Sequence, residues 1–123
     1  MGDRIFKQGQ GRRLGFDPHR SPYSFLIGGE EWAIELTPAE FDDFHRLTQE
    51  LRRTVLAIAP ELMAEETLHC ELDSETLWLE IEGYPHAYEL RLILHQGRRA
   101  EGQWAASVLP EFFVALDQIH IGT

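Results

Sequence analysis

The sequence has little cysteine, no long apolar run and few basic side chains. Its single cysteine, Cys70, excludes an internal disulfide and a cysteine-rich zinc module. A lone cysteine is typical of a reducing compartment. The apolar runs are only a few residues long, far below the roughly 20 that a helix needs to span a bilayer. The first residues also lack the apolar stretch of a secretion signal. We therefore expect a cytoplasmic protein that does not contact membranes.

Basic side chains are scarce, and they are unevenly placed. The chain carries 11 basic and 21 acidic side chains, for a net charge of −10. Residues 1–29 hold five of the basic groups and only two acidic ones, so the remainder of the chain is strongly acidic. This excess repels nucleic acid and anionic membranes at long range. An anionic ligand would have to bind near the N-terminal segment.

The sequence predicts one α+β domain over residues 1–123, because a chain of 123 residues has the length of a single domain with one hydrophobic core. In its first part, residues 12–16 and the hairpin 23–36 alternate as strands, with Gly28-Gly29 supplying positive φ for a two-residue turn. Thr37, Pro38 and Glu40 then predict a capped helix start. The helix ends or kinks at Pro60, and a short continuation is expected over 61–66.

The second part repeats this order of elements. Alternation predicts strands over 68–72, 77–82 and 88–94, with a weaker one over 99–105 and a helix from about 109 to 119. We therefore predict two tandem units, about 4–66 and 67–121, each of antiparallel strands followed by a helix. Trp32 and Trp104 are each followed by an alanine, and a proline lies five residues after each alanine. A Glu-Phe pair then follows each proline. A true repeat and convergent helix-start chemistry both explain this match.

No constellation typical of an enzyme is present. Cys70 and His69 are adjacent on a strand, so they point to opposite faces and cannot form a thiolate–imidazole pair. The six histidines lack the short His-His spacings typical of a metal site, which leaves only a site assembled by the fold. The carboxylate pairs lie at turns or on the solvent-facing sides of predicted helices and strands. We predict no catalytic residue, no cofactor site and no metal site, and thus a non-enzymatic protein.

Two surfaces are candidates for binding. A nucleic-acid or anion contact is predicted at Lys7, Arg12, Arg13 and Arg20, with Phe6, Phe16 and Tyr23 near enough to stack on bases. The alternative is that this segment is a flexible arm or a turn with no binding role. A partner surface is predicted at Trp78, Glu80 and Glu82, which alternate with apolar neighbours on one strand. Trp78 is either exposed there or covered by a helix.

Three phrases of the sequence resemble a small cyanobacterial family, domain of unknown function 1818. They are Gly-Arg-Arg-Leu-Gly at 11–15, Trp-Ala-Ile-Glu-Leu-Thr at 32–37 and Leu-Arg-Leu-Ile-Leu at 90–94. Members are similar in fold to the Whirly proteins, single-stranded DNA-binding transcriptional regulators built from two strand–helix units. The resemblance implies two packed sheets with two main, associating helices. The Whirly motif Lys-Gly-Lys-Ala-Ala is absent from this sequence, so the resemblance implies no DNA-contacting residue here.

Two functions from different classes are compatible with these features. The acidic surface, with an aromatic residue on a polar strand face, predicts an interaction module that binds a protein partner. The alternative is a single-stranded nucleic-acid binder that uses the basic N-terminal segment, as the fold resemblance suggests. A monomer is sufficient if the two units pair within one chain, and an exposed sheet edge would permit a dimer.

Overall fold

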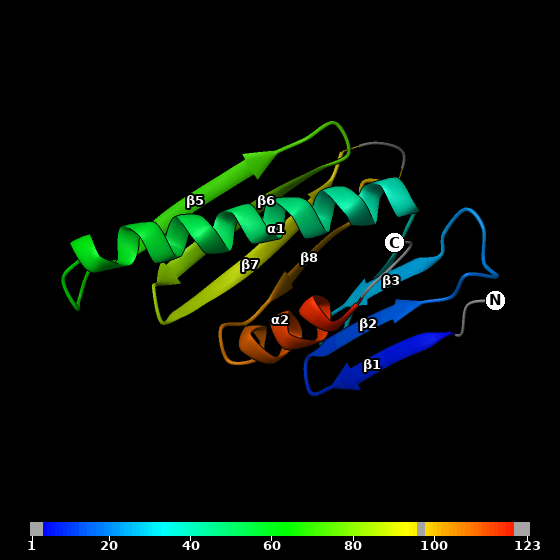
Figure 1. Cartoon of the computed structure of the whole chain (residues 1–123), viewed down its shortest axis with the longest axis horizontal. Coiled ribbons are helices and arrows are strands. Elements are labelled where there is room, and N and C mark those ends of the chain that lie inside the picture. The colour runs from blue at the N-terminus through cyan, green and yellow to red at the C-terminus, as the bar shows by residue number, and fades with distance from the viewer. Residues whose placement is uncertain (1–3, 96–97, 120–123) are drawn as a thin grey trace.

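The computed structural model describes residues 4–95 and 98–119. It contains two four-stranded antiparallel sheets, and each sheet is followed in the chain by its own helix (Figure 1). The elements are β1 (Ile5–Gly9), β2 (Arg12–Phe16), β3 (Phe25–Gly28), β4 (Ala33–Leu36), α1 (Pro38–Ile58), η1 (Ala59–Glu61, a 3-10 turn), β5 (Leu68–Asp73), β6 (Leu77–Tyr84), β7 (Ala87–Leu94), β8 (Glu101–Trp104) and α2 (Leu109–Gln118). The predicted order of strands and then helix, twice, is confirmed.

The first sheet has the strand order β1-β2-β3-β4. Its first strand, β1, was not predicted, and it pairs with β2 across a turn in which Gly11 has a φ of 69°. The predicted two-residue turn at Gly28-Gly29 is wrong. Gly28 instead ends β3 opposite Ala33, residues 29–32 form the connection, and neither glycine has positive φ. A Cβ on Gly28 would lie 2.7 Å from the Trp32 carbonyl oxygen, so a close backbone approach requires glycine there.

Helix α1 begins as its sequence predicts. The Thr37 side chain accepts from the Glu40 amide at 3.2 Å, and the Glu40 carboxylate accepts from the Thr37 amide at 2.9 Å, which completes a capping box. The α-helix ends before Pro60, whose ring and missing amide proton are incompatible with a further turn. The continuation predicted over 61–66 is wrong, because only the 3-10 turn η1 follows the helix.

The second sheet, of order β5-β6-β7-β8, has long strands in clear register. Leu79 of β6 lies opposite Leu72 of β5 and Leu92 of β7, and this alternation buries one face of the sheet. Cys70 shares that face and is half-buried against the core. Strand β8 is shorter than predicted, since it covers only Glu101–Trp104.

One hydrophobic core joins the two units, and Trp104 lies at its centre. This side chain is 1% exposed. Its ring stacks on Phe112 of α2 with centroids 4.4 Å apart and lies 5.7 Å from the ring of Phe44 of α1. Its indole nitrogen donates to the carbonyl oxygen of Gly28 in β3 at 2.8 Å. A single side chain at the end of β8 therefore contacts both helices and the first sheet.

Trp32 lies against the same centre from the first unit. Its ring meets Trp104 edge-on with centroids 4.8 Å apart, and its Nε1 donates to the Gln103 carbonyl oxygen at 3.1 Å. Gly102 makes room for it, because a Cβ there would lie 2.4 Å from the Trp32 ring. Trp32 precedes β4 whereas Trp104 ends β8, so the two tryptophans hold different places in their units.

The Glu-Phe pairs of the two units, in contrast, hold the same helical positions. Helix α1 starts at Pro38, whereas α2 starts at Leu109, one residue before its proline. Glu40 and Glu111 are therefore both the third residue of their helix, and each is followed by a buried phenylalanine. An acidic residue in the first turn stabilises the helix through its dipole.

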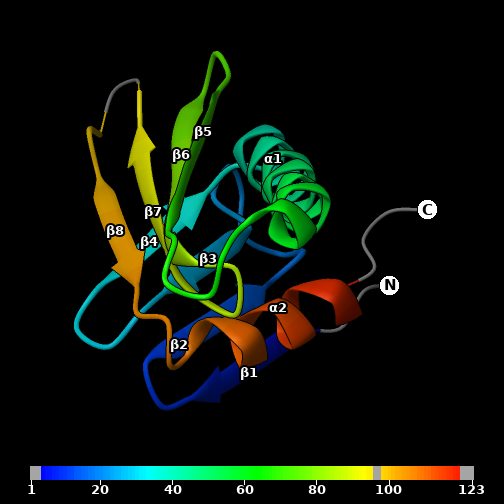
Figure 2. The same ribbon diagram turned by 90° about the vertical axis from the view of Figure 1, so that its left-hand side faces the viewer.

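Both helices lie on the same side of the second sheet, on the right in Figure 2. Helix α1 packs on β5 and β6, and α2 packs on β2 and β7. Within residues 4–95 and 98–119, no helix covers the opposite face of the second sheet. In the same part of the chain, no helix combines the length and the apolar character needed to cross a bilayer.

Candidate functional site

The uncovered face of the second sheet gathers most of its charged side chains. Because Leu77, Leu79 and Ile81 point into the core, their neighbours on β6 point to solvent. The same alternation on the other strands defines what we term the acidic sheet face: His69, Glu71, Asp73, Trp78, Glu80, Glu82, Glu89, Arg91, Ile93, Glu101 and Gln103. This face carries six carboxylates against one arginine.

Trp78 lies on the acidic sheet face and is not covered by a helix. The side chain is half-buried among its neighbours on the sheet. Its Nε1 donates to Glu71 Oε1 at 3.4 Å, and the Arg91 guanidinium lies 5.7 Å from its ring centroid. Ile93 of β7 is its cross-strand neighbour. The three predicted partner-surface residues, Trp78, Glu80 and Glu82, therefore do share one open face.

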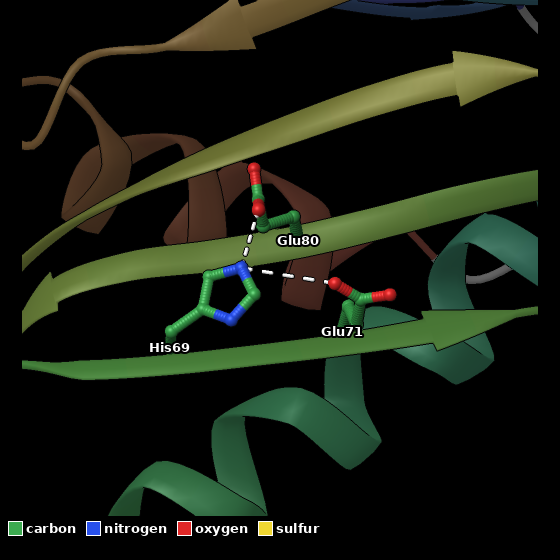
Figure 3. A group of neighbouring side chains, drawn as sticks. All are labelled: His69, Glu71 and Glu80. Carbon is green, nitrogen blue, oxygen red and sulfur yellow. Dashed lines mark hydrogen bonds and ion pairs between the residues drawn. The ribbon is translucent and has the colours of Figure 1, made fainter.

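A histidine and two glutamates meet on this face, as Figure 3 shows. His69 and Glu71 are two residues apart on β5, and Glu80 lies opposite Glu71 on β6. The His69 imidazole forms a close hydrogen bond with Glu80, and its Nε2 lies 3.7 Å from Glu71 Oε2. The nitrogen and the two carboxylates place ligand atoms within 4.8 Å of one another.

These carboxylates also change the protonation of the imidazole. The hydrogen bond with Glu80 raises the pKa of His69 above its usual value of 6.5, and the negative charges of Glu80, Glu71 and Glu82 act in the same direction. Sequence reasoning missed this group because it searched only for pairs of histidines. The available signal was His-x-Glu on a strand, where both side chains share a face, and the third member needed the register.

The structure does not bring the four predicted basic contacts together. In the β1–β2 pair, Lys7 lies opposite Leu14, so it shares the core-side face with Leu14 and Arg12, whereas Arg13 points to the other face. Arg12 pairs with Glu111 of α2 at 3.0 Å, and Arg13 donates to the Glu30 carbonyl oxygen at 3.2 Å. Arg13 therefore lies on the opposite face of the β1–β2 pair from Lys7 and Arg12, and an anion contact by Lys7, Arg12, Arg13 and Arg20 stays a prediction.

A different basic group forms on the first sheet instead. Arg20 pairs with Glu35 at 2.6 Å. Arg98, from the second unit, lies over the Tyr23 ring at 4.5 Å from its centroid, donates to the Glu35 carbonyl oxygen and pairs with Glu40. We term Arg20, Tyr23 and Arg98 the arginine–tyrosine group. Its two arginines each have an acidic partner, which lowers their availability to an external anion.

A groove lies beside this group, between the 17–24 connection and the first turns of α1. Its volume is about 870 Å³. Phe25 and Phe41 stack in its wall with centroids 4.1 Å apart, and Asp42 and His45 add polar atoms. The groove shares no residue with the acidic sheet face, so the two are separate features of the molecule.

The chain matches a known family over nearly its full length. The family model described as "Domain of unknown function (DUF1818)" matches residues 7–119.

The chain belongs to this family.

A solved relative has the same fold. It is the crystal structure of a protein with unknown function from the DUF155 family from Prochlorococcus sp. NATL2A, 33% identical to this chain, with a TM-score of 0.87. The superposition covers 92% of this chain and 96% of that one. A search of curated proteins found no match.

These comparisons confirm the resemblance to a family of unknown function with a link to cyanobacteria. They assign no activity, because neither the family description nor the solved relative carries one. The similarity to the Whirly proteins stays a prediction. What this DUF1818 member does must be argued from its own surfaces.

Proposed function

We propose that this protein is an interaction module that binds a basic segment of a protein partner on its acidic sheet face. The observation that carries the proposal is the open face of the second sheet, with six carboxylates, one arginine and the half-buried Trp78. The partner's chemistry follows from charge complementarity: lysine and arginine side chains match the carboxylates, and an apolar residue matches Trp78 and Ile93.

Two physical effects support binding at such a face. A concentration of one charge sign attracts an oppositely charged partner and raises its association rate. Affinity then depends on a few well-packed anchors, among which tryptophan is enriched. Trp78 suits this role because its indole already has two neighbours that orient it, a hydrogen bond to Glu71 and the guanidinium of Arg91. The charges would steer the partner, and the tryptophan would contribute most of the contact energy.

The experiment compares partners captured by matched charge variants in native extract. The test variant is Glu82→Lys with Glu89→Lys, which reverses two exposed charges on the acidic sheet face. The control variant is Asp42→Lys with Glu61→Lys, which changes the net charge equally on exposed sites outside that face. A partner retained by wild type and the control, lost by the test variant and weakened by salt supports the proposal. The same captured proteins with both variants would contradict it.

A second candidate, single-stranded nucleic-acid binding, is favoured by one observation. The arginine–tyrosine group places the Arg98 guanidinium over the Tyr23 ring, and Arg20 is joined to it through Glu35, which contacts both arginines. An arginine beside an aromatic ring is a pairing that stacks on bases. Labelled single-stranded DNA and RNA are titrated at rising salt with three proteins. These are wild type, the single variant Arg20→Glu, and the double variant Arg12→Glu with Arg13→Glu. Binding that falls steeply with salt and is lost in Arg20→Glu supports it. No binding at low salt removes this candidate.

A further inference from the structure

We propose that His69, Glu71 and Glu80 form a binding site for one divalent transition-metal ion of the Zn²⁺ class. The three side chains come from the two adjacent strands β5 and β6 and point toward one another on the acidic sheet face (Figure 3). They offer one imidazole nitrogen and two carboxylate groups, a donor set that suits Zn²⁺ and its neighbours in the first transition series. This proposal goes beyond partner binding, because it concerns these residues alone.

The orientation of the two carboxylates is the first argument. Each directs its Oε2 toward His69 Nε2, in direct contact for Glu80 and at 3.7 Å for Glu71. Each has its other oxygen, Oε1, near a donor outside the group: Trp78 Nε1 is 3.4 Å from that of Glu71, and Arg91 Nη1 is 3.8 Å from that of Glu80. The Trp78 contact is a hydrogen bond and the Arg91 contact is an ion pair. Outer partners of this kind orient metal-ligating side chains.

The strand register is the second argument. Glu71 lies directly opposite Glu80, and like charges in that position destabilise a sheet. His69 and Arg91 offset part of this repulsion, but Arg91 is 3.8 Å from Glu80 and also reaches toward Glu101 at 3.8 Å. A divalent cation between Oε2 of both carboxylates and His69 Nε2 would remove the remaining repulsion. The sheet holds the two charges together whether or not a cation is bound, so the ligands are preorganised.

The distances require only small side-chain movements. In a tetrahedral zinc site, bonds of about 2.0–2.1 Å place ligand atoms about 3.4 Å apart. The Nε2–Oε2 separation of 3.7 Å to Glu71 is close to this value, and the group as a whole lies within 4.8 Å. The His69–Glu80 contact would have to lengthen and the Glu71 oxygen to approach, and the His69 and Glu71 side chains, which are 48% and 53% exposed, are open to such rotation. The remaining coordination position faces solvent.

The same sheet contains a matched control. His95, which follows β7, contacts Asp73 as closely as His69 contacts Glu80, and both histidines are exposed. Among the described residues, the His69 group is the one in which a third ligand joins the pair. A metal that binds any exposed histidine–carboxylate pair would not distinguish His69 from His95, whereas a site with three ligands would.

The experiment titrates the metal-free full-length protein with ZnCl₂ by calorimetry, and with CoCl₂ while tryptophan fluorescence is recorded. We expect one ion per chain, with Co²⁺ quenching the emission of Trp78 beside Glu71. His69→Ala, Glu71→Gln and Glu80→Gln should each lower the affinity by at least about tenfold, whereas His95→Ala should leave it unchanged. Circular dichroism checks that each variant is folded.

Three results would overturn the proposal: no saturable binding, an equal loss in His69→Ala and His95→Ala, or binding that survives all three ligand substitutions. Each is measured on the isolated protein without a partner. Failure of the metal site therefore leaves the partner-binding proposal standing, and failure of partner capture leaves the metal titration unaffected.

Discussion

The two sheets have the same strand order and different outer side chains. On the first sheet, Phe6 lies over Gly15, so that a Cβ there would come within 3.1 Å of its ring, and Glu35 is paired with Arg20. On the second sheet the carboxylates of Glu82 and Glu89 lie opposite each other without a basic residue between them. Equivalent backbones therefore support different surfaces. The two units differ in their outer side chains, whereas their architecture is common to both.

The largest expected effect comes from breaking the connection between the two units. Trp104→Ala removes a fully buried ring and leaves the Gly28 carbonyl oxygen without its donor. We expect a loss of about 3–5 kcal/mol in the free energy of unfolding, as for other buried aromatic residues. Urea unfolding followed by circular dichroism measures it. Since one core serves both sheets, wild type should unfold in a single transition, and two separate transitions would contradict that view.

An intermediate effect is expected where α1 meets the second sheet. Asp43 accepts hydrogen bonds from Thr76 at 2.7 Å, Ser74 at 3.0 Å and Arg46 at 3.1 Å. Led by the Thr76 bond, these interactions lower the pKa of Asp43 below its usual 3.8, against the opposing effect of burial. Asp43→Asn should cost about 1–3 kcal/mol of unfolding free energy at neutral pH.

The pH dependence of Asp43 has a definite sign. Its folded pKa is lowered, so the stability it contributes is fully present above the unfolded value of 3.8 and is lost as pH falls through the folded value. The difference between wild type and Asp43→Asn should thus be largest near neutral pH and shrink below about pH 3.8. Denaturant midpoints at pH 7 and at pH 3 test this. A constant difference at both values would show that the ionised carboxylate is not what stabilises the contact.

The smallest effects on stability are expected from charge changes on the outer faces of the two sheets, and they should have opposite signs. Glu82→Lys places a cation opposite Glu89 and should stabilise the fold by about 0.2–1 kcal/mol. Glu35→Lys breaks the pair with Arg20 and should destabilise it by a similar amount, up to about 1 kcal/mol. Thermal unfolding at low and high salt measures both, and the two shifts should shrink as salt screens the charges. Shifts of the same sign would mean that the faces do not differ electrostatically.

The elements predicted correctly are those with local signals. The capping box at Thr37 and Glu40 depends on residues three apart, and three strands of the second sheet, β5, β6 and β7, alternate over six to eight residues. Strand β1 was missed because its apolar residues are few and it is stabilised by pairing with β2 across the Gly11 turn. Gly28 and Gly29 indicated a tight turn, but their lack of a side chain serves a close approach of Trp32 instead.

The candidate sites show the same division. The sharing of one face by Trp78, Glu80 and Glu82 followed from alternation alone. The group of His69, Glu71 and Glu80 could not be predicted, because it depends on which residues of β5 and β6 lie opposite each other. The four residues of the predicted anion contact are divided between faces for a related reason. Residues near in sequence, such as Arg12 and Arg13, point to opposite faces once they lie in a strand.

The two indole hydrogen bonds of the core set the order in which the protein can be completed during synthesis. Trp32 donates to Gln103, 71 residues later, and Trp104 donates to Gly28, 76 residues earlier. When the first unit emerges from the ribosome, Gln103 and Trp104 of the second unit have not yet emerged. Such distant contacts slow folding, because the long intervening segment must be ordered first. We therefore expect the first unit to reach its final packing only after β8 has formed, although each unit has a sheet and a helix of its own.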